Sequence, residues 1–435
     1  MTIADKLKQI KQSTDAIKAS VTALTGEVQT DLTSIATELD KFNPANATDL
    51  LAKLGYNSNN APDLYNALLN SLEERDTYEN NTAVLLPKLT LDENGVYTLQ
   101  SKMFKDSTIL TIPKGKYSCS GFNSMFEDCA NLLWIPDLEL SSSYSAYSHM
   151  FSGCTALRTV GNLNTAGCST AFYMFNGCVN LESITSMDTS NVTEMSNMFA
   201  GCAKLKSIPQ LDTSNVTKMR NMFSGCSTLE SLPQLDTSKV TDMSYIFNKC
   251  AALSSIPQLD YSSVTTMTYG FSYCTGLTTI PDLNFESATS LSNLFDACSN
   301  IVTVGKLNTP NITNVGSMFA SCSKLEKIES IDVQSVNTNY SIAGYSNMPN
   351  LKYVVFKNLG QSYSSWDFSR LTNWGVNSDT VPDAKQSLLD TLITYSYDRV
   401  SAGLSACTIK LHSKTKALLT EDEIAQITAK GFTIS

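Results

Sequence analysis

A repeat of 24 residues governs the middle of this 435-residue chain. Nine phenylalanines each precede a cysteine by three residues, and after one first step of 25 residues the spacing is 24 throughout. A fixed period of this length indicates a solenoid, in which each repeat forms one coil and buries its apolar side against its neighbours. The nine phenylalanines are Phe126, Phe151, Phe175, Phe199, Phe223, Phe247, Phe271, Phe295 and Phe319.

Each repeat combines a helical pattern with a short extended one. Four apolar residues have the spacing of one helical face, and Thr189 or Ser190 is placed to cap that helix. Residues 205–211 follow as an extended segment whose length Pro209 restricts. We therefore expect an α/β repeat solenoid that is leucine-rich-repeat-like. The four apolar residues are Val192, Met195, Met198 and Phe199.

The repeat also resembles a known family. Residues 198–205 read MFAGCAKL and residues 208–214 read IPQLDTS, a pattern that recurs over roughly residues 103–356. It resembles the BspA-type leucine-rich-repeat family. Similar members are bacterial surface adhesins and repeat modules in proteins of gut bacteria and their phages. The resemblance implies a binding role and names no ligand.

The N-terminal residues carry a heptad pattern. Their apolar residues alternate steps of four and three, with Thr14 in one seam position, which predicts a left-handed coiled coil over residues 1–42. Isoleucine at d with leucine or valine at a favours three or four strands, so we expect a homotrimer. A single amphipathic helix packed on its own domain is the alternative. The expected contacts between chains are Ile3, Leu7, Ile10, Ile17, Val21, Leu24 and Val28.

Three further parts follow the predicted stalk. Residues 43–100 are expected to form a helical connector, residues 101–360 the solenoid and residues 361–435 a small α+β C-terminal cap. Degenerate copies of the repeat at residues 103–113 and 348–351 are expected to cap the stack. Within the C-terminal part, Thr420 and Glu423 have the spacing of a capping box that begins a helix.

Composition excludes several classes of function. The chain has 31 basic and 41 acidic residues, a net charge of −10 and no Lys/Arg run, so a nucleic-acid partner is not expected. Only His149 and His412 supply imidazole, and neither has the spacing of a metal site or a catalytic triad. We expect no catalytic residue, no metal and no cofactor. No apolar stretch reaches about 18 residues, so membrane insertion is not expected either.

The recurring cysteines are interpreted as core residues. Identical positions in successive coils place one thiol in the core of each coil, and cysteine packs there as a small apolar side chain. We expect these nine thiols to be buried and reduced. Aspartates such as Asp212, Asp236 and Asp260 recur at one position of the coil, which suits turn capping better than acid–base catalysis.

One stretch breaks the repeat and is the predicted ligand-binding surface. Aromatic residues replace the Asn, Thr or Gly of regular copies, while Ile246 and Gly270 replace an inward methionine. Gly270 would then lose the burial of that side chain, about 1.5–3 kcal/mol. Aromatic faces at coil spacing could stack on sugar rings, and the alternative is a solvent-exposed or inter-subunit filler. The predicted ligand-binding residues are Tyr245, Tyr261, Tyr269, Tyr273 and Phe285.

These features together favour a phage tail fibre or baseplate protein. The N-terminus lacks the apolar region of a secretory signal, so the chain is expected to be made in the host cytoplasm and to reach the virion tail. Residues 2–7 (TIADKL) resemble the starts of phage tail and baseplate proteins. The expected function is recognition of a host-surface glycan or protein, with other virion tail proteins as partners. The alternatives are a structural virion protein that docks other subunits and a bacterial cell-surface adhesin.

Overall fold

A computed structural model gives the fold of the solenoid and of the C-terminal part. It describes residues 92–435 except 101, 108, 110, 113–114, 143–145, 166, 337–347 and 361–364. The chain divides into two compact units, Met1–Lys88 and Leu89–Ser435. The predicted coiled coil and most of the predicted connector lie outside the described residues.

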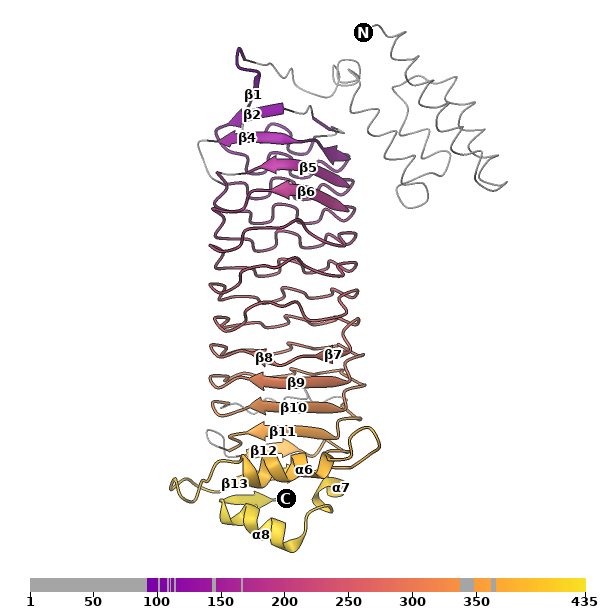
Figure 1. The fold of residues 1–435 in the computed structure, drawn as a ribbon, viewed down its shortest axis with the longest axis vertical. Coiled ribbons are helices and arrows are strands. Elements are labelled where there is room, and N and C mark those ends of the chain that lie inside the picture. The colour runs from indigo at the N-terminus through magenta and orange to yellow at the C-terminus, as the bar shows by residue number, and fades with distance from the viewer. Residues whose placement is uncertain are drawn as a thin grey trace, which may run out of the picture. The chain divides into compact units, whose positions relative to one another are not determined.

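The second unit is a stack of coils whose strands pair in parallel (Figure 1). In the first sheet β1, β2, β4 and β5 follow one another, and β3 and β6 both pair with β5. In the second sheet β11, β10 and β9 follow one another, and β7 and β8 both pair with β9. Lys327 pairs with Thr303, so the register between coils is one repeat of 24 residues. The strands are β1 Val96–Leu99, β2 Gly115–Cys119, β3 Trp134–Ile135, β4 Leu138–Ser142, β5 Thr159–Asn164, β6 Ser183–Met187, β7 Thr279–Ile280, β8 Leu283–Asn284, β9 Thr303–Asn308, β10 Lys327–Asp332 and β11 Tyr353–Lys357.

The strand of each coil depends on the residue ten positions after its phenylalanine. Where this residue is Gly161 or Gly305, one continuous strand forms, as in β5 and β9. Where it is proline, the strand is split, as between β3 and β4, or is not formed in the coils between β6 and β7, whose residues are all described. Proline has no N–H to donate to the ladder. The predicted effect of Pro209 is confirmed. The prolines at this position are Pro136, Pro209, Pro233, Pro257 and Pro281.

The helix predicted in each coil is wrong, and a ladder of overlapping turns takes its place. The residue two positions before each core phenylalanine has a positive φ, such as 59° at Asn197 and 60° at Tyr245. A right-handed helix excludes these values. Within one coil the N–H of Met198 donates to the carbonyl of Met195, and successive bonds of this kind overlap. The described part of the solenoid is therefore built from turns and strands, and the described helices lie in the C-terminal cap.

Hydrogen bonds along the stack explain why turns replace the helix. The N–H of Asn197 donates to the carbonyl of Arg220 at 2.8 Å, and the N–H of Phe199 donates to the carbonyl of Met222 at 2.9 Å. These bonds join each coil to the next, while the intervening N–H groups close turns inside the coil. Both sets of donors are thus satisfied. A helix would form its backbone hydrogen bonds within one coil, so this segment would not be joined to adjacent coils by backbone hydrogen bonds.

Two columns of side chains fill the core. The phenylalanines from Phe104 to Phe319 stack with ring centroids 5.2–5.8 Å apart. Each repeat cysteine is buried, and its Sγ donates to the carbonyl of the phenylalanine in the preceding coil, for example Cys226 to Phe199 at 3.1 Å. The nine repeat cysteines are all buried, so the predicted burial of these thiols is confirmed.

The C-terminal cap closes the last coil of the stack (Figure 1). The hydroxyl of Thr391 accepts the N–H of Phe356 at 3.0 Å and donates to the carbonyl of Val354, so one side chain satisfies a donor and an acceptor of β11. The indole of Trp374 donates to the same carbonyl at 3.2 Å. These bonds occupy the edge of β11, which faces the cap.

The cap itself is a parallel sheet in the order β12-β13-β14 with short helices. The side chain of Thr420 accepts the N–H of Glu423, and the Glu423 carboxylate accepts the N–H of Thr420, so the predicted capping box is confirmed. None of the helices that the structure describes is long and apolar enough to cross a membrane. The elements are β12 Ser365–Phe368, α6 Ala384–Leu389, the π-helix Asp390–Thr394, β13 Cys407–Leu411, α7 Ser413–Lys416, α8 Glu421–Ala429 and β14 Phe432–Ile434.

Candidate recognition surface

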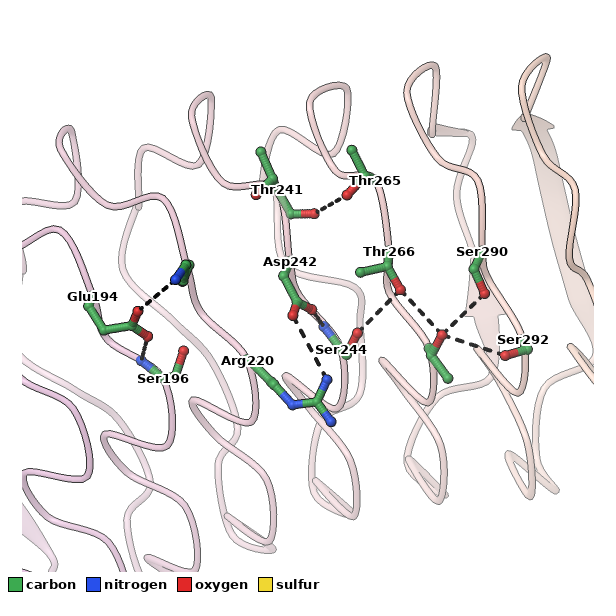
Figure 2. Close-up of polar contacts among 12 residues, drawn as sticks. Glu194, Ser196, Arg220, Thr241, Asp242, Ser244, Thr265, Thr266, Ser290 and Ser292 are labelled. Carbon is green, nitrogen blue, oxygen red and sulfur yellow. Dashed lines mark hydrogen bonds and ion pairs between the residues drawn. The ribbon is translucent and has the colours of Figure 1, made fainter.

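The turn ladder places three residues of each coil outside the core columns. They lie five, three and two positions before the core phenylalanine, and we call their columns the turn face. In the coil of Phe199 they are Glu194 and Asn197, which are half-buried, and Ser196, which is 5% exposed, whereas Met195 and Met198 are fully buried. The inward residues repeat from coil to coil, and the residues of the turn face differ. Figure 2 shows the middle of this face.

Charged residues occupy one end of this region. Lys218 pairs with Glu194 at 3.6 Å, and Arg220 pairs with Asp242 at 3.8 Å (Figure 2). The side chains of Lys218 and Arg220 are 63% and 49% exposed. Exposed ion pairs contribute about 0–1 kcal/mol, so these two contribute little to holding the coils together. Asp242 also accepts the N–H of Ser244 at 2.8 Å, which fixes its carboxylate.

Hydroxyl groups replace the charges in the next coils. Thr266 lies 3.3 Å from both Ser244 and Thr268, and Thr268 lies 3.3 Å from Ser290 (Figure 2). Each of these hydroxyls has a hydrogen-bond partner, and Ser244 is itself buried. The turn face therefore changes from charged to neutral and polar within three coils.

Two of the predicted aromatic residues form a stack on the turn face. The rings of Tyr245 and Tyr269 are 4.9 Å apart at an angle of 14°. The guanidinium of Arg220 lies 5.4 Å from the centre of the Tyr245 ring, on the preceding coil. Both faces of Tyr245 are thus covered by neighbours of its own chain. Tyr273 lies nearby and is 50% exposed.

The other two predicted binding residues are in the core. Tyr261 is 4% exposed and Phe285 is fully buried, so neither can contact a ligand at the surface. They occupy the column of Thr213 and Thr237, whose side chains are also buried. The hydroxyl of Tyr261 donates to the carbonyl of Pro257 at 3.0 Å, which satisfies its one polar atom. Burial raises the pKa of this phenol well above its usual range.

The expected packing loss at Gly270 is also absent. A Cβ built on Gly270 would lie 2.5 Å from Cγ of Met267 and 3.0 Å from Cδ1 of Leu294. The side chain of Met267 therefore occupies the volume that a methionine at position 270 would fill. Gly270 is a compensated substitution, and it does not mark a functional site.

A second column of residues with a left-handed backbone conformation was not predicted from the sequence. Two positions after the core phenylalanine, four coils carry glycines with φ of 73–79°. Lys249 and Tyr273 hold the same position at φ of 63° and 61°. A left-handed conformation costs a residue with a Cβ roughly 1–2 kcal/mol. The available signal was the Asn and Gly that flank Phe199 and Phe223 at the same spacing. The glycines are Gly153, Gly177, Gly201 and Gly225.

The remaining candidate chemical groups have structural roles. Asp236 accepts the N–H and the hydroxyl of Ser238 at 3.0 and 2.7 Å, which confirms turn capping for this column. His149 stacks on Tyr173 at 4.8 Å, and its Nδ1 lies 3.9 Å from Glu127. In the described ranges, no group of three or more His, Cys, Asp or Glu side chains is placed to hold a metal ion.

Comparison with protein families identifies the repeat. Residues 74–192 match the family described as BspA type leucine rich repeat region (6 copies). The chain carries BspA-type leucine-rich repeats. Its later repeats, over residues 167–280, 247–355 and 289–376, match a family described as Mycoplasma protein of unknown function, DUF285. No curated protein matches the chain.

Two solved structures are similar to this BspA-type repeat protein. A leucine-rich repeat protein from Bacteroides ovatus is 16% identical, with a TM-score of 0.35, over 80% of this chain and 91% of its own. The leucine-rich repeat protein of T. pallidum is 16% identical, with a TM-score of 0.25, over 55% of this chain and 87% of its own.

Proposed function

We propose that this BspA-type repeat protein is a non-enzymatic phage virion tail fibre or baseplate protein. In this proposal the solenoid recognises a host-surface glycan or protein. The observation that carries the binding role is the separation of a constant interior from a variable turn face. Side chains in the Phe and Cys columns repeat in nine successive coils, while the turn face changes from Glu194 to Lys218 to Asp242 in three of them.

The hydrogen bonding of the coils supports this role. Each coil is joined to the next through peptide groups, so the fold places few demands on the outward side chains. Their pairs at the surface are weak, as the exposure of Lys218 and Arg220 indicates. An elongated scaffold whose outer residues are free to vary is well suited to display a binding surface.

The chemistry of the conspicuous side chains supports a non-enzymatic role. The repeat thiols are buried, and burial raises the pKa of Cys226 to about 12, which suppresses the nucleophilic thiolate. The aspartates of the turn column are held by serines two residues later, as in Asp212 with Ser214. Neither set is arranged as a nucleophile with a base.

The predicted stalk completes the proposal. We propose that residues 1–42 associate into a trimer through Ile3, Leu7, Ile10, Ile17, Val21, Leu24 and Val28, which would present three solenoids together. Three linked binding sites raise the avidity for a dense surface without new contacts. The partners are then other tail proteins on the virion and a host-surface molecule.

Two measurements test the proposal. Particles purified by density gradient from the culture that expresses the gene should contain the protein by mass spectrometry. Fluorescently labelled full-length protein should bind cells of the host strain, and binding should saturate. A protein that is found in particles but binds no cells would favour the structural virion role. Binding to cells with display on the producing bacterium, and absence from particles, would favour the adhesin.

A further inference from the structure

The tyrosine stack on the turn face ends abruptly. In successive coils the order along the stack is Arg220, Tyr245, Tyr269 and Asn293. Tyr245 is covered on both sides, whereas Tyr245 is the only ring partner of Tyr269 in the described part of the chain. The next residue in this column is Asn293, whose side chain is shorter than a tyrosine and carries no ring. Coils are about 4.8 Å apart, which is close to the spacing of stacked rings, so a ring bound at this level would continue the stack.

A carboxylate borders the same space. Asp296 lies in the coil of Asn293, three residues further along, and its carbonyl accepts the N–H of Tyr273 at 2.8 Å. Burial is the main reason that the pKa of Tyr269 is raised, and the charges of Tyr245 and Asp296 raise it further, which places Asp296 near the Tyr269 hydroxyl. Burial raises the pKa of the Asp296 carboxyl, and a hydrogen bond with the backbone of Ala297 lowers it in part. A partly buried carboxylate without a compensating cation favours ligands that donate hydrogen bonds to it.

We propose that Tyr269, Asn293 and Asp296 form a subsite for one neutral pyranose ring of a surface glycan. The ring stacks on the open side of Tyr269 as the next member of the column. The carboxylate of Asp296 accepts hydrogen bonds from its hydroxyls, and the amide of Asn293 donates and accepts one each. This subsite rests on the proposed recognition function and names its ligand class.

The charge of the surroundings selects among sugars. Asp296 would repel a uronic or sialic acid, and the net charge of −10 on the chain adds to this repulsion. Tyr273, half exposed beside Tyr269, extends the apolar edge of the subsite. Neutral hexoses and their N-acetyl derivatives fit this environment, whereas acidic polysaccharides do not.

Asn293→Tyr tests the subsite by filling it. The new ring would continue the stack on Tyr269 and leave Tyr269 and Asp296 in place. Asn197→Tyr is the matched control, because Asn197 follows Tyr173 in the same column as Asn293 follows Tyr269, and its φ of 59° is close to the 57° of Asn293. The probe is a printed array of neutral and acidic bacterial polysaccharides, with dissociation constants measured for the best ligand.

We expect the wild-type protein to bind at least one neutral polysaccharide. Asn293→Tyr should weaken that binding at least tenfold, which corresponds to about 1.4 kcal/mol, and Asn197→Tyr should leave it unchanged. If Asn293→Tyr does not fold by circular dichroism, Tyr269→Asn replaces it, because asparagine occupies this left-handed position in other coils. Tyr269→Asn should likewise weaken binding tenfold.

Three results would overturn the subsite: no neutral polysaccharide bound, equal binding by Asn293→Tyr and wild type, or equal loss in both asparagine variants. Binding of labelled wild-type protein to host cells is measured in parallel. Cell binding that survives Asn293→Tyr refutes the subsite alone. Absence of cell binding by the wild type refutes the proposed recognition function.

Discussion

Alkaline pH should destabilise this solenoid far more than an ordinary protein of its size. Burial raises the pKa of Cys226 and Cys298 from 9.0 to about 12, and it raises the pKa of Cys202, Cys250 and Cys274 well above 9.0. A group whose pKa is higher in the folded state contributes stability that is complete below its unfolded pKa. That stability is lost as the pH rises towards the folded pKa. The sensitive range therefore begins near pH 9.

The loss can be worked out for one thiol. Between pH 8 and pH 10 a thiol that ionises only in the unfolded chain costs about 1.4 kcal/mol, since one unit of pKa corresponds to about that free energy. The nine repeat thiols together cost on the order of 10 kcal/mol. Such a loss is comparable to the whole stability of a typical domain. The coils should unfold at pH 10 in a urea concentration that leaves them folded at pH 8.

Urea unfolding followed by far-UV circular dichroism at both pH values measures this effect. Cys226→Ala provides the control, because it costs packing at both pH values and removes one ionisable group. Its loss of stability between pH 8 and pH 10 should be about 1.4 kcal/mol smaller than that of the wild type. An equal loss in both proteins would refute the reasoning. So would rapid labelling of most repeat thiols by a thiol reagent at pH 8.

Three further predictions follow from local geometry. Gly201→Ala should lower the free energy of unfolding by about 1 kcal/mol, because φ is 79° at this residue. Ala297→Gly, where φ is 59°, should raise the free energy of unfolding in the same urea assay. Asp296→Asn should raise the melting temperature, because burial disfavours the charged form of this carboxyl and raises its pKa, whereas the amide carries no charge to bury. A melting temperature that falls would contradict this. Light scattering should give a trimer for the full chain and a monomer after deletion of residues 1–42. Ile10→Asp and Ile17→Asp should have the same effect as the deletion. A trimer without the stalk would place the interface elsewhere.

The period, the core columns and the capping box could be predicted from the sequence. Each of these depends on which residues recur, and the recurrence is explicit in the sequence. Phe199 and Cys202 are buried in the structure because every coil must present the same apolar side to its neighbours. The capping box at Thr420 and Glu423 is local in the chain, so the residues themselves indicate it.

The turn ladder could not be predicted from apolar spacing. Met195, Met198 and Phe199 have the separations of a helical face, and overlapping turns give the same separations. The distinction lies in the backbone, where Asn197 and Gly201 adopt a positive φ. Hydrogen bonds to a neighbouring coil stabilise that backbone, and these are contacts that a single repeat does not reveal.

Two of the predicted binding residues, Tyr261 and Phe285, are in the core, and their burial could not be predicted from residue type. Threonine is treated as a polar residue, so Tyr261 and Phe285 were expected to replace surface positions. Thr213 and Thr237 are nevertheless buried in that column, and aromatic rings substitute for them in the core. Gly270 likewise suggested a lost methionine until the side chain of Met267 was found in its place.

Backbone strain does not by itself single out the tyrosines of this surface. Tyr245, Tyr269 and Tyr273 all adopt φ between 57° and 61°, and His149, Tyr173 and Lys249 adopt similar values at the corresponding positions of other coils. Strain alone therefore does not mark a site. What distinguishes Tyr269 is that its ring stack ends there, beside the carboxyl of Asp296, and the proposed sugar ring would continue that stack.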